Sequence, residues 1–360
     1  MVSIPKNIEE LVSYKPGKPI QEIVREFNLS EWAVLWNNEN NLGASPKVAE
    51  AIAEASKNIH RYPDPASLQL REKLAELNDC SVDQVMVDNG SESLLDNLFR
   101  SFFDKGDELL TCEGTFVAVY IWAKSNNKPV AKIPLGRGYR FDVKKLIESV
   151  TPQTKAIYLA NPNNPTGAMI TADELNELID FVSEDVLIIV DEAYYEYAKV
   201  ISPDYPDSFK LRKPNVITLR TLSKAYAIAG MRIGYALGPD ALSEAMTKVK
   251  MTFAPSNIAQ AAAIAALNDE HHLKHSVTLN KAALQQFYTA IHEAEINYVP
   301  SYGNFVMLDL ETPEFAKEFT HQMMKKGVFV RHLPAFGLPH CVRVSTGTEK
   351  ENMLFSRSIR

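Results

Sequence analysis

The segment from Arg220 to Gly234 combines a lysine, hydroxyl groups and an arginine in a pattern that suits carbonyl chemistry. Lys224 follows an expected strand, lies beside Ser223 and precedes Arg232 by eight residues. A lysine that is partly desolvated and close to cations can lose its proton and attack a carbonyl carbon. Thr221, Ser223 and the guanidinium of Arg232 together suit a phosphate group. A solvated surface lysine is the alternative, which the small residues of this loop disfavour because they indicate close packing.

A second loop, at residues 89–93, follows another expected strand and precedes a helix. Gly90 permits a sharp turn there, so the backbone amides of Ser91 and Glu92 would lie at the helix N-terminus. Free amides and the helix dipole attract an anion at such a terminus. A plain helix cap is the alternative.

The turn Asn161–Gly167 also follows directly after an expected strand. Its two prolines, three asparagines and glycine make it rigid. Side-chain amides such as that of Asn164 can donate to a ligand oxygen. A turn without a ligand is the alternative reading.

A fourth loop begins with Asp191 and contains Tyr194, and it follows the apolar run Val186–Val190. An acid at the end of a core strand is costly to bury unless it meets a cation or a functional partner. A capping role for Asp191 is the alternative. Ligands of parallel α/β sheets bind beyond the carboxyl ends of the strands, so we expect these four loops to meet.

The elements that would position these loops alternate from about 85 to 238, as a mostly parallel α/β sheet requires. After about 240 come long helical stretches, one of which, between 241 and 265, is expected to link two domains. Three further strands then alternate with a helix and predict a smaller α+β region. The expected strands are 85–87, 108–112, 156–160, 186–190, 216–219 and 233–236, then 305–310, 328–331 and 342–345.

Composition excludes several classes of protein. The 360 residues suit one large and one smaller domain, and the net charge of −7 argues against a general nucleic-acid partner. No apolar run is long enough to cross a bilayer, and the N-terminus lacks the pattern of a secretory signal. The three cysteines are widely spaced, which suits free thiols in a reducing cytoplasm and predicts no metal site.

Together the four loops offer the groups that pyridoxal phosphate requires. They supply an amine for its aldehyde, an acid for its pyridine nitrogen, phenol and amide donors for its ring oxygen, and a cup for its phosphate. The acid matters because a protonated pyridine ring is the electron sink of this cofactor.

These residues resemble those of the fold-type I enzymes that use pyridoxal phosphate, and among them the histidinol-phosphate aminotransferase family. The resemblance covers nearly the whole chain, and its motifs follow in the family's order. The matching segments are Tyr14–Gly17, Asn38–Asn40, Leu42–Gly43, Ser45–Pro46, Arg61–Pro65, Asn161–Gly167, Asp191–Tyr194, Arg220–Gly234 and Val342–Gly347.

The resemblance implies a role for each matching residue near the cofactor. Lys224 would carry the cofactor as a Schiff base and move a proton during catalysis, while Asp191 would pair with the pyridine nitrogen. Tyr194 and Asn164 would bind the ring oxygen. Phe116 would stack on the ring, although it equally suits a core position. The remaining cofactor contacts would be Ser91, Glu92, Thr221, Ser223 and Arg232 at the phosphate.

It also implies substrate contacts and a second subunit. Tyr62 would reach the phosphate site of the neighbouring subunit, which predicts a homodimer. Arg343 would bind the α-carboxylate of 2-oxoglutarate or glutamate, and Arg331 and Tyr14 the phosphate of histidinol phosphate. Asn40 matches a position on the substrate side. Surface ion pairs are the alternative for the two arginines.

The implied architecture is a large domain with a mostly parallel seven-stranded sheet, a smaller α+β C-terminal domain and an N-terminal arm. We expect the arm over 1–35 and the large domain over 36–245. The small domain is expected over 246–360, together with part of the N-terminal segment.

Three departures from the family's pattern bear on the substrate. Asn41 stands where proline is usual, Gly114-Thr-Phe116 replaces Pro-Thr/Ser-Tyr, and Glu92-Ser93 replaces Asp-Glu. Backbone amides and ring stacking survive these changes, so cofactor binding is still expected. The substrate assignment is weakened, because the first of these segments lines the side-chain pocket in the family.

The function implied is a cytoplasmic ping-pong aminotransferase of histidine biosynthesis that acts on histidinol phosphate and 2-oxoglutarate. One alternative is an aromatic amino-acid aminotransferase, and another is a decarboxylase of the threonine-phosphate type. A regulatory module that only binds pyridoxal phosphate is disfavoured, since the first thirty residues are too few and insufficiently basic for a DNA-binding domain.

Overall fold

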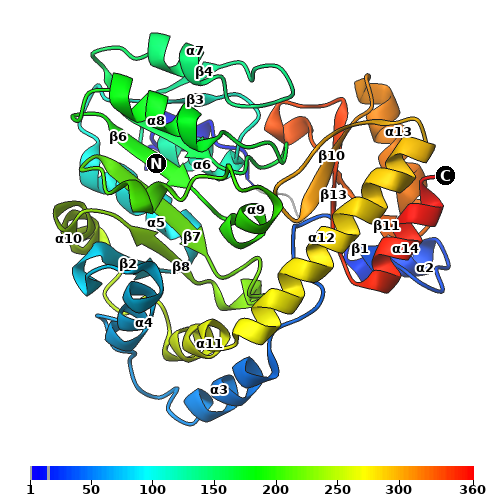
Figure 1. Cartoon of the computed structure of the whole chain (residues 1–360), viewed down its shortest axis with the longest axis horizontal. Helices are drawn as coiled ribbons and strands as arrows, with labels where there is room; N and C mark the ends of the chain where they lie inside the picture. Colours follow the sequence, from blue (N-terminus) through cyan, green and yellow to red (C-terminus); the bar gives the residue numbers. More distant parts are fainter. Residues whose placement is uncertain (1, 14–16) are drawn as a thin grey trace.

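The computed structural model describes residues 2–13 and 17–360 (Figure 1). Its largest element is a seven-stranded sheet in the order β2-β8-β7-β6-β5-β3-β4, in which only β8 runs antiparallel to its neighbours. The predicted mostly parallel seven-stranded sheet is therefore confirmed. The strands are β2 (Val85–Asp88), β3 (Glu108–Cys112), β4 (Val130–Ile133), β5 (Thr154–Ala160), β6 (Leu187–Asp191), β7 (Val216–Thr221) and β8 (Gly234–Leu237).

Of these strands, the sequence pattern missed β4. This strand lies at the edge of the sheet, and three of its four residues are at least partly exposed. An edge strand does not need the continuous apolar run that marks a strand covered on both faces. Its only fully buried residue is Ile133, so the pattern had too little signal.

Helices cover both faces of the sheet. On one face α5, α6 and α10 enclose an apolar cluster with the central strands. On the other, α7 and α8 cover β3 to β7, while α3, α4 and α11 cover β2 and β8. The bounds are α3 (Pro46–Ser56), α4 (Leu68–Asn78), α5 (Gly90–Phe102), α6 (Val117–Ser125), α7 (Val143–Glu148), α8 (Ala172–Phe181), α9 (Tyr195–Ile201), α10 (Asp240–Val249) and α11 (Asn257–Leu267).

The C-terminal part contains a four-stranded antiparallel sheet in the order β12-β13-β10-β9. Helices α12, α13 and α14 enclose a separate apolar cluster with it. This is the smaller α+β region that the sequence predicted. Its elements are α12 (Glu270–Glu293), β9 (Asn297–Val299), β10 (Phe305–Asp309), α13 (Pro313–Lys325), β11 (Val328–Phe329), β12 (Arg331–His332), β13 (Cys341–Ser345) and α14 (Glu349–Ser358).

The N-terminal segment contributes to both parts of the molecule. Its short helices are α1 (Lys6–Glu9) and α2 (Ile20–Glu26), and Asn7 donates to two backbone carbonyls at the end of α6. Strand β1 (Ala33–Val34) then pairs in parallel with β11. The chain therefore passes from β1, which forms a two-stranded sheet with β11 in the C-terminal part, back to the layers of the large sheet at α3.

The prediction of one linking helix over 241–265 was wrong. The chain forms α10 and α11 there, and Pro255 lies between them after a cis peptide bond. A proline lacks the N–H that helix continuation needs. The long helix is instead α12, which follows α11 and runs from there toward the C-terminal part (Figure 1). The proposed domain boundaries at 35 and 245 stay a prediction. No helix within the described ranges is both long and apolar enough to span a bilayer.

Candidate active site

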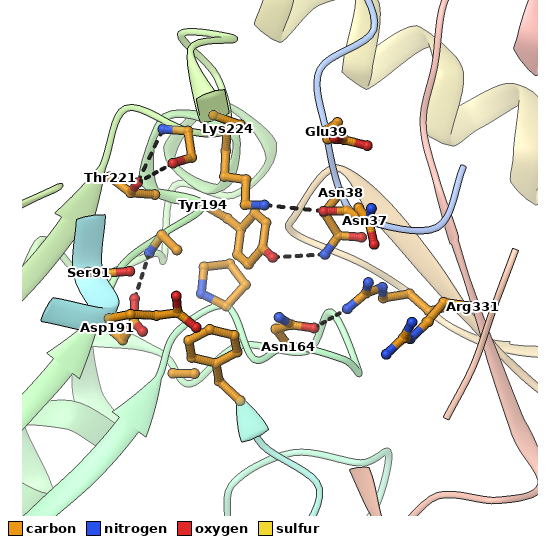
Figure 2. Close-up of a pocket in the computed structure, with 18 of the residues that line it drawn as sticks. Asn37, Asn38, Glu39, Ser91, Asn164, Asp191, Tyr194, Thr221, Lys224 and Arg331 are labelled. Atoms are coloured by element: carbon orange, nitrogen blue, oxygen red, sulfur yellow. Dashed lines mark hydrogen bonds between the residues drawn. The ribbon is translucent and has the colours of Figure 1, made fainter. Parts of the chain in front are cut away.

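A cavity of about 560 Å³ lies beyond the carboxyl ends of the parallel strands, between the large sheet and the C-terminal part (Figure 2). All four predicted loops reach it, because each follows one of the strands β2, β5, β6 and β7. The predicted site residues that line it are Ser91, Glu92, Phe116, Asn164, Asp191, Tyr194, Thr221, Ser223, Lys224, Arg232, Arg331 and Arg343.

Lys224 follows β7 and points its amine into this cavity. Its Nζ donates to the backbone carbonyl of Asn37 at 3.3 Å. Burial, followed by the positive charge of Arg343, lowers the pKa of Lys224 to about 8, and Glu39 acts in the opposite direction. Roughly a fifth of the amine is therefore neutral near physiological pH, far more than for an ordinary lysine, and the neutral form is the nucleophile toward carbonyls.

Asp191 ends strand β6 and is only 3% exposed. Its carboxylate accepts hydrogen bonds from the Tyr158 hydroxyl and from the backbone N–H of Ala193. Burial raises the pKa of Asp191 to about 6, although both hydrogen bonds act against that rise. A cationic ring nitrogen in the cavity would remove most of this burial penalty.

Tyr194 lies beside Lys224 and is almost fully buried. Its hydroxyl accepts a hydrogen bond from the Asn38 side chain at 2.8 Å. Asn38 is itself held by Ser345 of β13, whose hydroxyl donates to the Asn38 side-chain oxygen. The segment after β1 thus connects Tyr194 to the C-terminal sheet.

The backbone at the start of α5 approaches β8 very closely. A side chain at Gly234 would place a Cβ 2.5 Å from the Ser91 nitrogen, and one at Gly90 would lie 2.9 Å from the Arg232 guanidinium. Gly90 also has a positive φ of 80°, which favours glycine. The result is a cup formed by a helix N-terminus, Arg232 and the two hydroxyls of Thr221 and Ser223, which lie 2.9 Å apart.

Of the three asparagines in the turn at 161–167, only Asn164 lines the cavity. Asn161 exchanges two hydrogen bonds with the backbone of Ile170, and Asn163 binds Thr115 and the Gly114 carbonyl. These two amides hold the turn in place. Two of the three side-chain amides that suggested a ligand site therefore stabilise the turn itself.

Arg343 of β13 enters the cavity from the C-terminal sheet. One of its terminal nitrogens donates to the Asn164 side chain, and the other donates to the Trp36 carbonyl at 2.8 Å. The third nitrogen, Nε, is buried and makes no hydrogen bond with the described residues. Burial lowers the pKa of Arg343 to about 10, so it remains a cation at neutral pH. Arg331 of β12 lies on the same wall of the cavity.

Three predicted site residues are placed elsewhere or are not described. Asn40 faces a neighbouring cavity, and its amide donates to the Ala225 carbonyl and to Ser276. Tyr62 is 79% exposed and stacks on Phe253 at the surface. Tyr14 lies outside the described residues.

The sequence interpretation missed several cavity residues. Asn37 and Phe336 carried no signal, because they come from loops without a recognisable motif. Asn38 and Glu39 belong to a matched segment, which could have marked them. The walls are completed by Ala160, which adjoins a recognised motif, and by residues inside the recognised motifs, namely Pro162, Ala193, Ala229 and Gly230.

Away from this cavity, Asp309, His340 and Cys341 bring three possible metal-ligand atoms within 4.8 Å of one another. The Tyr139 hydroxyl bonds to both Asp309 and His340, at 2.6 and 3.1 Å. Because this hydroxyl already satisfies two of the three groups, we assign the cluster a structural role, in which it ties the loop before α7 to the C-terminal sheet.

Comparison with known protein families decides the chemistry of the cavity. The model of the family described as aminotransferase class I and II matches residues 30–358. The chain belongs to this family. The loop at 220–234 that carries Lys224 and the turn at 161–167 both lie within the matched region.

Individual members of the family are similar over their whole length. A protein of Carboxydothermus hydrogenoformans named histidinol-phosphate aminotransferase 2 is 37% identical over 99% of this chain and 98% of its own. A crystal structure of histidinol-phosphate aminotransferase from Sinorhizobium meliloti, in complex with pyridoxal 5′-phosphate, superimposes with a TM-score of 0.90 at 28% identity. It covers 100% of this chain and 97% of its own. An aspartate aminotransferase variant of Thermus thermophilus has the same fold, with a TM-score of 0.85 at 24% identity over 99% and 100% of the two chains.

Proposed function

We propose that this aminotransferase uses pyridoxal 5′-phosphate and transfers the amino group between histidinol phosphate and glutamate or 2-oxoglutarate, as a step of histidine biosynthesis in the cytoplasm. The observation that carries the proposal is the layout of one cavity. An amine, an acid and a phosphate cup occupy the side nearer the large sheet, and two arginines occupy the opposite wall. The similarity to histidinol-phosphate aminotransferases over the full length supports this substrate.

The residues fit the cofactor in chemistry and in space. The cup at Gly90, Ser91 and Arg232 suits its phosphate, since added side chains at Gly90 or Gly234 would fill it. Asp191 is a buried acid to which no cation of the described residues donates a hydrogen bond, which suits the pyridine nitrogen. The set that would hold the cofactor is Ser91, Glu92, Phe116, Asn164, Asp191, Tyr194, Thr221, Ser223, Lys224 and Arg232.

When bound, pyridoxal phosphate supplies an aldehyde that captures an amino group and a ring that accepts electrons from the substrate α-carbon. Lys224 would provide the amine for this aldehyde, and its Nζ would move a proton between the substrate α-carbon and the C4′ carbon of the cofactor. Asp191 keeps the ring nitrogen protonated by balancing its charge. Tyr194 and Asn164 orient the ring through its oxygen.

The two arginines would orient the substrates. Arg343 has a free buried Nε–H and suits the α-carboxylate of glutamate or 2-oxoglutarate. Arg331, on the same wall, suits the phosphate of histidinol phosphate or the distal carboxylate of glutamate. Phe336 lies over the Arg343 guanidinium, 5.8 Å from it, and helps to exclude water there.

A homodimer is part of the proposal. Tyr62 and Phe253 stack on an exposed surface that also includes Ile59 and Met251, which are 66% and 72% exposed. Such an apolar surface is typical of an interface, and it would allow Tyr62 to reach the phosphate of the neighbouring subunit. Light scattering coupled to gel filtration tests the dimer. A monomeric active enzyme would contradict it.

The cofactor assignment is tested with Lys224→Ala. Adding pyridoxal phosphate to the wild-type protein should produce the near-visible absorption of the bound cofactor, and the variant should lack this absorption and be inactive. An active Lys224→Ala enzyme would contradict the proposal.

The substrate is tested by kcat/KM with 2-oxoglutarate for histidinol phosphate, phenylalanine and tyrosine on one preparation. A preference of about 100-fold for histidinol phosphate, about 2.7 kcal/mol, is expected. Comparable values, together with tolerance of Arg331→Ala, would indicate an aromatic amino-acid aminotransferase. Release of carbon dioxide without a 2-oxoacid would instead indicate a decarboxylase.

A further inference from the structure

Asp191 is held by two hydrogen-bond donors that carry no charge. Its Oδ2 accepts from the Tyr158 hydroxyl at 2.8 Å, and its Oδ1 accepts from the backbone N–H of Ala193 at 3.2 Å. Lys224, whose charge acts on Asp191, donates its hydrogen bond to the Asn37 carbonyl instead. The carboxylate is therefore fixed in direction but not neutralised, and it faces the cavity.

Tyr158 lies behind Asp191 and does not line the cavity. It is fully buried on β5, where Ala160 pairs with Asp191 of the neighbouring strand β6. Its ring belongs to the apolar cluster between the sheet and helices α5 and α6, so it has little freedom to turn away. Burial and the nearby Asp191 carboxylate raise the pKa of Tyr158 well above its ordinary value, which keeps its hydroxyl a proton donor.

We propose that Tyr158 is a positioning residue whose hydroxyl keeps Asp191 ionised and directs its carboxylate to the ring nitrogen of bound pyridoxal phosphate. This inference rests on the proposed function, because it needs the cofactor in the cavity. Without the hydroxyl, a buried carboxylate would retain only one neutral donor. It would then take up a proton more readily and would balance a cationic ring less well.

The test compares Tyr158→Phe with a matched variant, Tyr120→Phe. Tyr120 packs against the same apolar cluster, but its hydroxyl donates to the Cys112 carbonyl and not to Asp191. Apoproteins of both variants and of the wild type are titrated with pyridoxal phosphate and with 1-deazapyridoxal phosphate. The second ligand carries a C–H in place of the ring nitrogen and retains the aldehyde and the phosphate.

In Tyr158→Phe the Kd for pyridoxal phosphate should rise about 10- to 100-fold, as expected for losing a hydrogen bond to a charged group. The Kd for the deaza compound should change by less than about threefold, since that compound offers no cation to Asp191. Tyr120→Phe should change neither value. An equal loss of affinity for both ligands would show a mere packing role and overturn the inference, as would an unchanged Kd for pyridoxal phosphate.

A second variant pair keeps the inference testable if Tyr158→Phe alone fails to fold. The double variant Tyr158→Phe/Asp191→Asn has no carboxylate that could lose its hydrogen-bond donor. Its Kd for pyridoxal phosphate should therefore equal that of Asp191→Asn. A further loss in the double variant would overturn the inference. The proposed function fails separately, namely if the wild-type protein does not bind pyridoxal phosphate or if Lys224→Ala keeps the near-visible absorption.

Discussion

Two buried arginines of this molecule have opposite surroundings. The contrast distinguishes an arginine that stabilises the fold from one that is available to a ligand. Arg220 is 2% exposed, and all three of its nitrogens donate hydrogen bonds, to Glu192, Asp207 and Asn78. Burial alone would lower the pKa of Arg220, but the carboxylates of Glu192 and Asp207 raise it well above its ordinary value. The charge of Arg220 is therefore satisfied within the protein.

Arg343 is 5% exposed, and its hydrogen bonds go to an amide and a backbone carbonyl. A neighbouring pair of acids repeats this contrast, since Glu192 meets Arg220 whereas Asp191 meets two neutral donors. Asp191 is the last residue of β6 and Glu192 follows it, yet the two adjacent acids share no hydrogen-bond partner among the described residues. Burial without a counter-charge thus distinguishes Asp191 and Arg343 as the groups suited to bind a charged ligand.

The largest difference between the two arginines should appear in folding stability. Arg220→Met leaves the buried Glu192 and the partly buried Asp207 without their cation, and it should lower the free energy of unfolding by about 3–5 kcal/mol. Arg343→Met removes a cation that has no carboxylate partner, and it should leave the stability of the apoprotein nearly unchanged. Urea unfolding of both apoproteins measures this, and equal losses would contradict the comparison.

The two kinds of acid should respond to pH in opposite directions. The pKa of Asp191 is raised from 3.8 to about 6 in the folded protein. Its contribution to stability is therefore complete below the unfolded value and is lost as pH rises through 6. Relative to Asp191→Asn, the wild-type apoprotein should lose about 2 kcal/mol between pH 4 and pH 7.

Asp207 is the matched control for that titration. Burial would raise the pKa of Asp207, but Arg220 and its hydrogen bonds lower it overall. Its contribution should therefore be present at neutral pH and be lost on acidification below its ordinary pKa. Unfolding free energies of Asp207→Asn and the wild type, compared at neutral pH and at pH values below 3.8, check the sign. If the Asp207 contribution persisted below that pH, the contrast with Asp191 would be contradicted.

Replacing Arg343 should have a smaller effect, and this effect should appear in the affinity for the substrate. Arg343→Gln should weaken binding of 2-oxoglutarate by about 2 kcal/mol, roughly 30-fold, because a charge-assisted hydrogen bond is lost. The affinity of the apoprotein for pyridoxal phosphate should change little. Equilibrium titration of the two ligands measures both effects, and an unchanged affinity for 2-oxoglutarate would exclude the proposed carboxylate contact.

The smallest effect concerns the coupling between Arg343 and Lys224. The amine has a pKa of about 8, lowered mainly by burial and then by Arg343. Reductive methylation of Lys224 in the apoprotein should therefore reach half its maximal rate near pH 8. Arg343→Gln should move that midpoint upward by roughly half to one pH unit. Mass spectrometry of the modified peptide follows the reaction, and a downward movement would refute the coupling.

Much of the cofactor side of the cavity could be predicted, because its residues follow strands of one parallel sheet. A strand end and its loop are local features, and parallel strands bring their carboxyl ends together without further information. Lys224, Asp191 and Ser91 were found in this way. The small edge strand β4 was missed because it buries only one residue fully.

The remaining contacts depend on pairings between distant segments that no local pattern encodes. Asn38 reaches Tyr194 only because β1 pairs with β11. Tyr158 looks like any apolar strand residue until its hydroxyl is seen beside Asp191. Asn40 has a plausible type for a substrate contact, yet its amide is used to hold the lysine loop against α12.

The pairing of β1 with β11 has a consequence for the order in which the site is built during synthesis. Ala33 pairs with Val328, so this two-stranded sheet cannot form until residue 328 has been synthesised. The large sheet needs nothing beyond Leu237, which ends β8. The amine and the phosphate cup can thus form on a nascent chain before Arg331 and Arg343, which lie later in the sequence, have been synthesised.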